Sequence, residues 1–266
     1  MTDGKNRKLI WKLAKNDFKK RYAGSYMGAL WALVQPVVTV VLYYFVFEVV
    51  FQNRSQMLAN GIEAPYVLWL TAGLVPWFYF SEAVMQGMYA FLEYNYLVKK
   101  VVFEIRVLPV VKVLGASFIH VFFAAVLLLM YFIYGMKPSL CLLQLPYYSF
   151  CMFLLILAIS YTTSAIVVFF RDLAQIVNIL MQIGMWATPI LWDLSFLRGR
   201  WEALRIFFQL NPVYYIVNGY RESLFEGRWF WQDLSLTLYF WGVTLILYGI
   251  GMTLFKRCKV HFADVL

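Results

Sequence analysis

The sequence predicts an all-α integral membrane protein. Of its 266 residues 63% are apolar and only 14% are charged, whereas soluble domains average about 45–50% apolar and about 25% charged. Mean hydropathy is high, at +0.69. Six apolar segments of helical length also follow one another too closely for a soluble domain to fit between them. This pattern excludes a soluble enzyme, a disordered chain and a fibrous chain.

Residues 1–28 are predicted to form a cytoplasmic amphipathic helix that lies on the membrane surface. Ile10, Ala14 and Phe18 recur at four-residue spacing, which places them on one face of a helix. We expect this segment to remain in the mature protein, because the apolar run after it is long enough to span and has no small-residue cleavage site. Basic side chains fill the other face, among them Lys12, Lys15, Lys19 and Arg21.

Residues 29–266 are predicted to form one membrane domain of six spans. A helix rises 1.5 Å per residue, so about 20 residues cross a hydrocarbon core of about 30 Å. The second span contains Pro76 as well as Glu82 and Gln86, and we expect it to be bent or tilted. The expected spans cover residues 30–51, 66–91, 107–134, 145–170, 176–192 and 234–255, with a short polar turn at Arg171 and Asp172.

The basic residues predict the orientation. Sixteen of the 23 Lys and Arg residues fall in segments that are cytoplasmic if the amino terminus is inside. Because basic residues concentrate on the cytoplasmic side, both termini are expected there. The net charge of +9 lies beside apolar spans, which favours an anionic membrane surface over nucleic acid as the partner.

The long external segment, residues 193–233, is predicted to hold two short amphipathic helices. Trp201, Leu204 and Phe208 form an apolar stripe, and Asn211-Pro212 supplies an N-cap and a first-turn proline for the second helix. The two helices could re-enter the membrane as an outer gate or pack on the bundle as a lid. The apolar face of the second helix comprises Val213, Ile216, Val217, Tyr220 and Leu224.

The sequence offers little for catalysis, and we expect a chain that is not an enzyme and binds no metal or cofactor. It contains no phosphate-binding loop of the G-x-x-x-x-G-K-[ST] type and no Cys/His/Asp group at metal-ligand spacing. His120, within the third span, is interpreted as a neutral imidazole hydrogen-bonded between helices, with a proton relay as the alternative. The abundant aromatic residues fit an interfacial belt, or a path along which sugar rings slide.

Several strings, in order along nearly the whole chain, resemble ABC-2 type permeases that export polysaccharides. Those permeases are the membrane subunits for O-antigen, capsule and wall teichoic acid. The chain departs from their pattern at Glu104, where they usually have Pro. The matching strings are residues 21–31, Gln35-Pro36, residues 95–100 through Pro109, residues 169–173, residues 186–190, residues 210–213 and residues 262–264.

The resemblance implies an all-α, type V exporter-like fold and a homodimer that binds two copies of an ABC ATPase, which would hold ATP and Mg. It implies a polyprenyl-diphosphate-linked glycan, exported across the cytoplasmic membrane of a bacterium. The first helix and the segment between spans two and three would meet the ATPase, the latter through Leu97, Lys99, Lys100, Val101, Glu104 and Arg106. The first span, the fifth span and the outer helices would line or close the channel through Tyr22, Trp31, Tyr43, Trp186, Pro189, Asn211, Pro212 and Tyr215.

Spacing adds a prediction for the segment between spans two and three. Leu97, Val101 and Ile105 recur every four residues, which predicts a helix of about three turns with an apolar stripe. Two other functions stay open. One is an ABC-2 permease for a drug or a lipid, and the other is a membrane-embedded transferase acting on a polyprenyl lipid. The transferase would need carboxylates or histidines clustered at one membrane face, and the sequence shows no such cluster.

Overall fold

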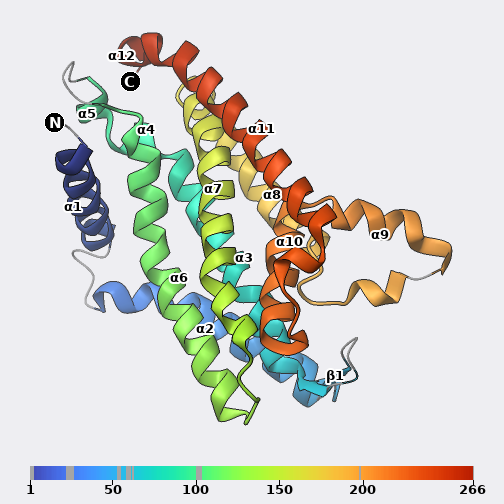
Figure 1. The fold of residues 1–266 in the computed structure, drawn as a ribbon. Coiled ribbons are helices and arrows are strands. Elements are labelled where there is room, and N and C mark those ends of the chain that lie inside the picture. The colour runs from blue at the N-terminus through green and yellow to red at the C-terminus, as the bar shows by residue number, and fades with distance from the viewer. Residues whose placement is uncertain are drawn as a thin grey trace.

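The computed structural model describes residues 3–21, 27–52, 55–57, 61, 63–99, 104–197 and 199–265. They form a helical bundle in which both ends of the chain lie at the same end of the molecule (Figure 1). The longer helices are α1 (Asp3–Arg21), α2 (Trp31–Tyr43), α3 (Tyr66–Met88), α6 (Val107–Ile133), α7 (Leu145–Val167), α8 (Leu173–Ala187) and α11 (Leu234–Cys258). The shorter helices are α4 (Ala90–Glu93), α5 (Asn95–Val98), α9 (Glu202–Gln209), α10 (Pro212–Arg221) and α12 (Phe262–Val265).

Single turns of other helix types extend or connect these helices. Two π-helical turns continue α2 and α10 over Tyr44–Val50 and Glu222–Glu226. The 3-10 turns are Gly28–Leu30, Leu140–Gln144, Leu194–Leu197, Gly199–Trp201, Phe230–Gln232 and Lys259–His261.

Five helical segments in the described part of the chain are long and apolar enough to cross a membrane, as expected of a multi-pass all-α membrane protein. They are Trp31–Val50, Tyr66–Met88, Val107–Ile133, Leu140–Val167 and Leu234–His261. The five segments match five of the six expected spans to within a few residues. Two segments are longer than expected because they include the 3-10 turns Leu140–Gln144 and Lys259–His261.

The expected fifth span corresponds to α8, and its predicted bounds were wrong. The helix begins at Leu173 and ends at Ala187, so its 15 residues extend only about 22 Å. It stops because Thr188 adopts extended backbone angles, φ −95° and ψ 124°, and the ring of Pro189 disfavours helical angles at the residue before it. The count of six spans therefore stays a prediction.

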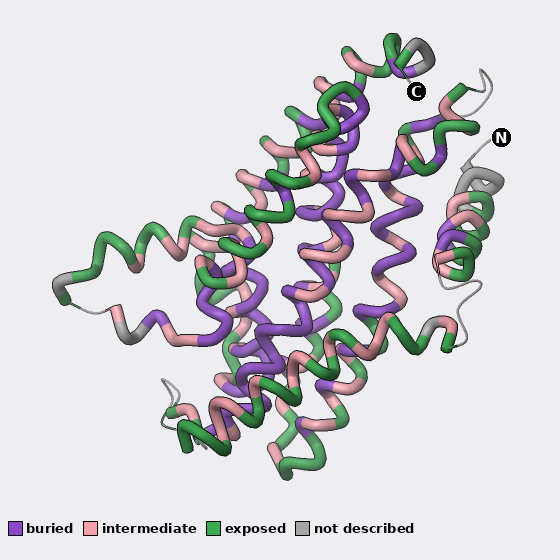
Figure 2. Tube along the Cα trace, turned by 180° about the vertical axis from the view of Figure 1, so that it is seen from behind, coloured by how far each residue is buried: buried purple, intermediate pink, exposed green. Residues whose placement is uncertain are grey.

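The core of the bundle centres on α3, which packs against α6 and α7 (Figure 2). Most of α3 is buried, whereas α2 has no buried residue and crosses one side of the bundle. On the other side α11 packs on α7 at Gly251. A Cβ there would lie 2.9 Å from the carbonyl oxygen of Ala158, so glycine permits this close approach.

A group of four phenylalanine rings holds the carboxyl-terminal segment against the bundle. The ring of Phe262 lies 5.0 Å from Phe91, which follows α3, and 6.0 Å from Phe169, which follows α7. Phe255 completes the group at 5.5 Å from Phe91. The end of α11, the α7–α8 turn and α4 therefore lie together, at the end of the molecule that holds both termini.

A short hairpin, which was not predicted from the sequence, connects α2 to α3 at the opposite end. Strands β1 (Ser55–Met57) and β2 (Glu63–Pro65) pair antiparallel, with Gln56 opposite Ala64. With three residues each, these strands are too short to show a clear alternation of apolar and polar residues.

Residues 193–233 form the two predicted short helices, α9 and α10. Asn211 caps α10 as expected, since its side-chain Oδ1 accepts a hydrogen bond from Val213 N at 3.0 Å, and Pro212 occupies the first turn. The predicted apolar face of α10 is buried, whereas α9 projects from the bundle (Figure 1). Where the two helices lie relative to the membrane stays a prediction.

The predicted three-turn helix from Leu97 to Arg106 is wrong. Helix α5 ends at Val98, and Glu104 to Arg106 form a turn that leads into α6. Ile105 is only 4% exposed, because it packs into the core instead of presenting an apolar stripe to a partner. Lys100 and Val101 lie outside the described residues.

Candidate functional site

A cleft of about 390 Å³ opens between α2, α3 and α8. Polar side chains from all three helices reach it, although each helix is mostly apolar. Amide, hydroxyl and carboxylate groups together with an indole ring can bind a ligand with both polar and apolar surfaces. The lining comprises Trp31, Ala32, Gln35, Pro36, Phe78, Ser81, Glu82, Met85, Asn178 and Met181.

Next to this cleft, charged side chains from α1, α3, α4 and α6 form an ion cluster, defined as Asp17, Arg21, Glu82, Glu93 and Lys112. Lys112 is 3% exposed and donates hydrogen bonds to Asp17 at 2.6 Å and to Glu93. Burying an ammonium group is costly unless carboxylates compensate it, and here two of them do. A pocket of about 430 Å³ lies beside the cluster.

Arg21 connects the two parts of the cluster. Its Nη1 donates to Glu82 Oε1 at 3.1 Å, and its Nη2 donates to Asp17 Oδ2 at 3.3 Å and also to Gln86. Gln86 in turn donates to the same Glu82 oxygen at 2.6 Å. Asp17 further accepts a hydrogen bond from the Tyr94 hydroxyl at 2.8 Å. The end of α1 is thus linked directly to α3.

Apolar contacts hold the rest of α1 on α6. Ala14 is fully buried, and the rings of Trp11 and Phe18 meet Phe118 edge-on at 5.3 and 5.7 Å. This packing separates the four basic residues that the sequence analysis grouped together. Arg21 points into the ion cluster, whereas the exposed residues on the other side are Lys12, Lys15 and Lys19.

At the opposite end of the bundle, a buried arginine joins α10 to the segment that follows α8. Arg221 donates hydrogen bonds to the carbonyl oxygens of Pro189 at 2.7 Å and Ile190 at 2.6 Å. Asn211 Nδ2 donates to Thr188 Oγ1 at 2.8 Å and fixes the same segment from the start of α10. Pro189, Asn211 and Pro212, expected to line or close a channel, therefore belong to one joint between α8 and α10.

The other residues expected in the channel are dispersed. Only Trp31, 53% exposed, lies in the cleft, whereas the Tyr43 hydroxyl contacts Met185 Sδ at 3.9 Å on α8. Trp186 is 64% exposed on the outer surface of α8. Tyr215 is buried, with its hydroxyl 3.1 Å from both the Tyr147 hydroxyl and Thr237 Oγ1. Tyr22 lies outside the described residues.

His120 lies in a separate buried network that joins four helices, α3, α6, α7 and α10. Its Nε2 is 3.0 Å from Ser149 Oγ on α7 and 3.0 Å from the hydroxyl of Tyr220 on α10, and Tyr79 stacks on the ring at 4.5 Å. The interpretation as an imidazole hydrogen-bonded between helices agrees with these contacts.

The residues expected to meet the ATPase lie near the end that holds both termini. Lys99 is exposed and Leu97 is partly buried. Glu104 and Arg106 form an exposed ion pair at 2.5 Å, and the Arg106 carbonyl oxygen accepts a hydrogen bond from Tyr161 at 2.8 Å. The polar turn also forms, with Arg171 and Asp172 both exposed.

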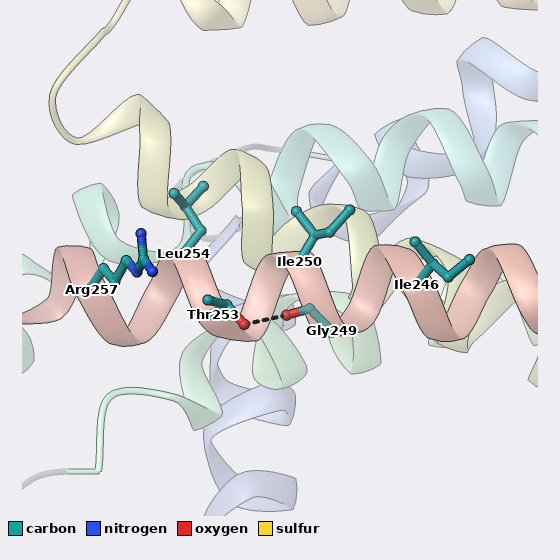
Figure 3. A pocket seen from close by; sticks show the side chains of 6 residues that line it. All are labelled: Ile246, Gly249, Ile250, Thr253, Leu254 and Arg257. Atoms are coloured by element: carbon teal, nitrogen blue, oxygen red, sulfur yellow. Dashed lines mark hydrogen bonds between the residues drawn. The ribbon is translucent and has the colours of Figure 1, made fainter.

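A shallow groove of about 490 Å³ runs along the outer surface of α11 (Figure 3). Ile246, Ile250 and Leu254 project to one side, with Gly249 between them and Arg257 near the end of the helix. An apolar groove on one spanning helix fits contact with lipid, and a basic residue at a helix end can reach the membrane surface.

Apart from Trp31 and Arg21, the residues that define the cleft and the ion cluster were not predicted as site residues from the sequence. Gln35 and Asn178 are polar residues within apolar spans, which was an available signal. Glu82 was noted only as a residue in a broken helix. Asp17 and Lys112 gave no signal, because their pairing across 95 residues depends on how α1 packs on α6.

Comparisons with known proteins agree with this architecture. The family model described as ABC-2 type transporter matches residues 8–225. An O-antigen export system permease protein RfbA of Klebsiella pneumoniae is 26% identical over 260 residues, which cover 97% of this chain and 95% of the relative. A protein of the same name from Myxococcus xanthus is 28% identical over 258 residues, with the same coverage. The chain therefore belongs to the ABC-2 type transporter family, as a membrane subunit that works with a separate ABC ATPase subunit.

Proposed function

We propose that this chain is the permease subunit of an ATP-driven ABC transporter that exports a lipid-linked polysaccharide, of the O-antigen or teichoic acid type, across the cytoplasmic membrane. The observation that carries the proposal is the match to O-antigen export permeases over 97% of the chain. The cleft supports it, because Trp31 offers an aromatic face beside the amides of Gln35 and Asn178. A sugar ring can stack on such a face while its hydroxyls find hydrogen-bond partners.

The proposed orientation has both termini in the bacterial cytoplasm. Two observations support this orientation. The amino and carboxyl ends lie at the same end of the bundle, and most of the basic residues fall in segments assigned to the cytoplasmic side. The exposed side chains of Lys12, Lys15 and Lys19 would then face the anionic membrane surface or the ATPase.

The proposed assembly is a homodimer of this chain with two ATPase subunits, which bind ATP and Mg. Apolar surfaces on α2 and α8 support the dimer. Large apolar side chains are exposed on both helices, including Val41 on α2, Phe45 on the π-helical turn that continues it and Ile183 on α8, and a second copy would cover them. The polyprenyl-diphosphate-linked glycan is the proposed cargo.

Deletion of the gene for this chain tests the cargo. We expect lipid-linked glycan to accumulate in the cytoplasmic leaflet and to disappear from the cell surface, and re-expression to restore export. A partner ATPase whose phosphate-binding lysine is replaced is the matched control and should reproduce the deletion. Normal surface glycan in the deletion strain, together with lost efflux of a drug or lipid, would contradict the proposal.

The assembly is tested by purification. The chain should co-purify with an ATPase subunit in equal amounts and should hydrolyse no ATP alone, because it lacks a phosphate-binding loop. Tight ATP binding by the isolated chain would be the contrary result.

A further inference from the structure

The ion cluster links α1 to the cleft through one carboxylate. Glu82 lines the cleft, and its Oε1 accepts a hydrogen bond from Arg21 at the end of α1, at 3.1 Å. Gln86 is the other donor to that oxygen, and it carries no charge. The charge that faces the cleft from α3 therefore depends on a residue of a helix that packs outside the cleft.

The Arg21–Glu82 pair is not needed to hold α1 in place. Ala14 is fully buried, the rings of Trp11 and Phe18 contact Phe118 on α6, and Lys112 already provides Asp17 with a cation at 2.6 Å. The two side chains are 22% and 34% exposed, and such a partly buried ion pair adds little net stability, because desolvation and solvent screening offset its Coulomb attraction. The main consequence of the pair is to neutralise a carboxylate on the cleft wall.

We propose that Arg21 sets the charge of the cleft wall according to the position of α1. With Arg21 in place, Glu82 is neutralised and a phosphate-bearing head group can enter the cleft. When α1 moves away, the carboxylate of Glu82 loses its cation and repels the head group. That the cargo bears phosphate rests on the proposed function. That α1 controls the charge of the cleft wall is independent of it.

The geometry makes this control sensitive to small movements. Arg21 is the last residue of α1, and the lysines on the other side of the same helix are exposed, so a partner that binds them would act on the helix that carries Arg21. The cluster contains two cations, Arg21 and Lys112, and three carboxylates, so withdrawal of Arg21 leaves the remaining charge strongly negative. In a site with low-dielectric walls, such a change has a large effect on the local potential.

The potential of the cleft can be measured without any knowledge of the cargo. Asn178, exposed on the α8 wall, is replaced by cysteine in the assembled complex, after Cys258→Ser removes the partly exposed native thiol. The readout is the ratio of the reaction rates with a cationic and an anionic methanethiosulfonate reagent. A cysteine at Gly227, at the other end of the bundle, is the control position.

We expect Arg21→Gln to raise the cationic-to-anionic ratio at position 178 by about three- to tenfold and to leave it unchanged at position 227. Adding Glu82→Gln should return the ratio at position 178 to within about twofold of its original value, because the exposed charge is then removed. A purely structural role of Arg21 would give no such rescue. An unchanged ratio in Arg21→Gln, or failure of Glu82→Gln to restore it, would overturn the proposal.

Dependence on the position of α1 is tested by comparing nucleotide-free and vanadate-trapped complexes. The ratio should differ between the two states when both Arg21 and Glu82 are present and should not differ in Glu82→Gln. The same ratio in both states of the unmodified pair would refute the control by α1.

The link to cargo is tested by the ATPase activity that a polyprenyl-diphosphate glycan stimulates. Arg21→Gln should raise the half-saturating glycan concentration about tenfold, and the double variant should restore it to within about threefold. If the glycan does not stimulate the ATPase activity even of the unmodified complex, the proposed function fails. The ratios of the methanethiosulfonate reaction rates still decide whether Arg21 controls the charge of the cleft.

Discussion

The guanidinium carbon of Arg221 lies 3.4 Å from the centroid of the Trp69 ring. The same side chain donates hydrogen bonds to the carbonyl oxygens of Pro189 and Ile190, and more weakly to that of Trp69 at 3.4 Å. A planar guanidinium can stack and donate in several directions at once, which an ammonium group cannot do. One residue therefore fastens α10 to α3 and to the chain that follows α8.

We expect Arg221→Lys to destabilise the protein although it keeps the positive charge. The lysine loses the stacking and cannot satisfy the carbonyl groups of both Pro189 and Ile190, which costs about 1–3 kcal/mol when a buried polar group is left without a partner. The melting temperature in detergent should fall by several degrees. Arg228→Lys is the control, because the Arg228 side chain is 61% exposed. Equal melting temperatures for the two variants would refute the fastening role.

Gly219 provides a second test of how α10 is packed. A Cβ at this position would overlap the ring of Tyr148, which is only 1% exposed and has no free space to move into. We expect Gly219→Ala to destabilise the protein by about 1–3 kcal/mol or to prevent folding. Gly242→Ala on α11 is the matched control, since no atom lies within 4 Å of its added Cβ. It should be neutral or slightly stabilising, because alanine favours helix. Equal effects would contradict the packing of α10 on α7.

Much of the fold could be predicted from the sequence, because long apolar segments specify helices locally. Val107–Ile133 carries its own signal over 27 residues, and Asn211-Pro212 is a complete start signal for α10. The end of α8 was missed because the apolar residues continue to Trp192, while the backbone changes at Thr188. The helix expected from Leu97 to Arg106 was wrong because four-residue spacing cannot show that Ile105 packs into the core.

The candidate site could be predicted only in part. Trp31 was identified, and the basic character of α1 was recognised. The inward direction of Arg21 was not, since its helical position follows from packing of Ala14 and Phe18 on α6. Contacts between residues far apart in the chain, such as Arg21 with Glu82, are properties of the tertiary structure.

Single cysteines test the orientation. Cysteines that replace Gln56 in the hairpin and Gly227 after α10 should react with impermeant reagents added outside the cell, and a cysteine at Lys99 should not. Lys99 and Gly227 are both exposed, so burial cannot explain a difference between them. The native thiols require one change, Cys258→Ser, because Cys141 and Cys151 are buried. Labelling at Lys99 alone would reverse the proposed orientation.

Stability should depend on pH through Glu222. Burial raises the pKa of Glu222 from 4.5 to about 7, and the carboxylate of Glu226 adds to this, while Arg228 opposes it at 3.8 Å. The folded protein binds this proton more tightly than the unfolded chain. The stabilisation is therefore complete below about pH 4.5 and is lost as the pH rises through about 7.

The melting temperature measured from pH 5 to 8 should fall with pH in the unmodified protein and less steeply in Glu222→Gln. Glu202→Gln is the control, because the Glu202 side chain is 53% exposed and should leave the slope unchanged. Identical slopes in the unmodified protein and Glu222→Gln would show that Glu222 does not titrate in this range.

Glu104→Lys tests whether the segment before α6 transmits ATP-driven motion. Glu104 pairs with Arg106 at 2.5 Å, but their side chains are 47% and 59% exposed. An exposed pair contributes about 0–1 kcal/mol, so the reversal should leave folding and insertion intact. If the segment docks on the ATPase, the reversed charge should weaken assembly about tenfold or uncouple ATP hydrolysis from export.

Glu202→Lys reverses a comparably exposed carboxylate, paired with Arg205 at 3.2 Å on the side assigned as external. It should assemble and export normally, because no ATPase reaches that side. Assembly is measured by co-purification, and coupling is measured as glycan exported per ATP hydrolysed. Equal behaviour of the two variants would show that the segment acts only as a charged anchor at the membrane surface.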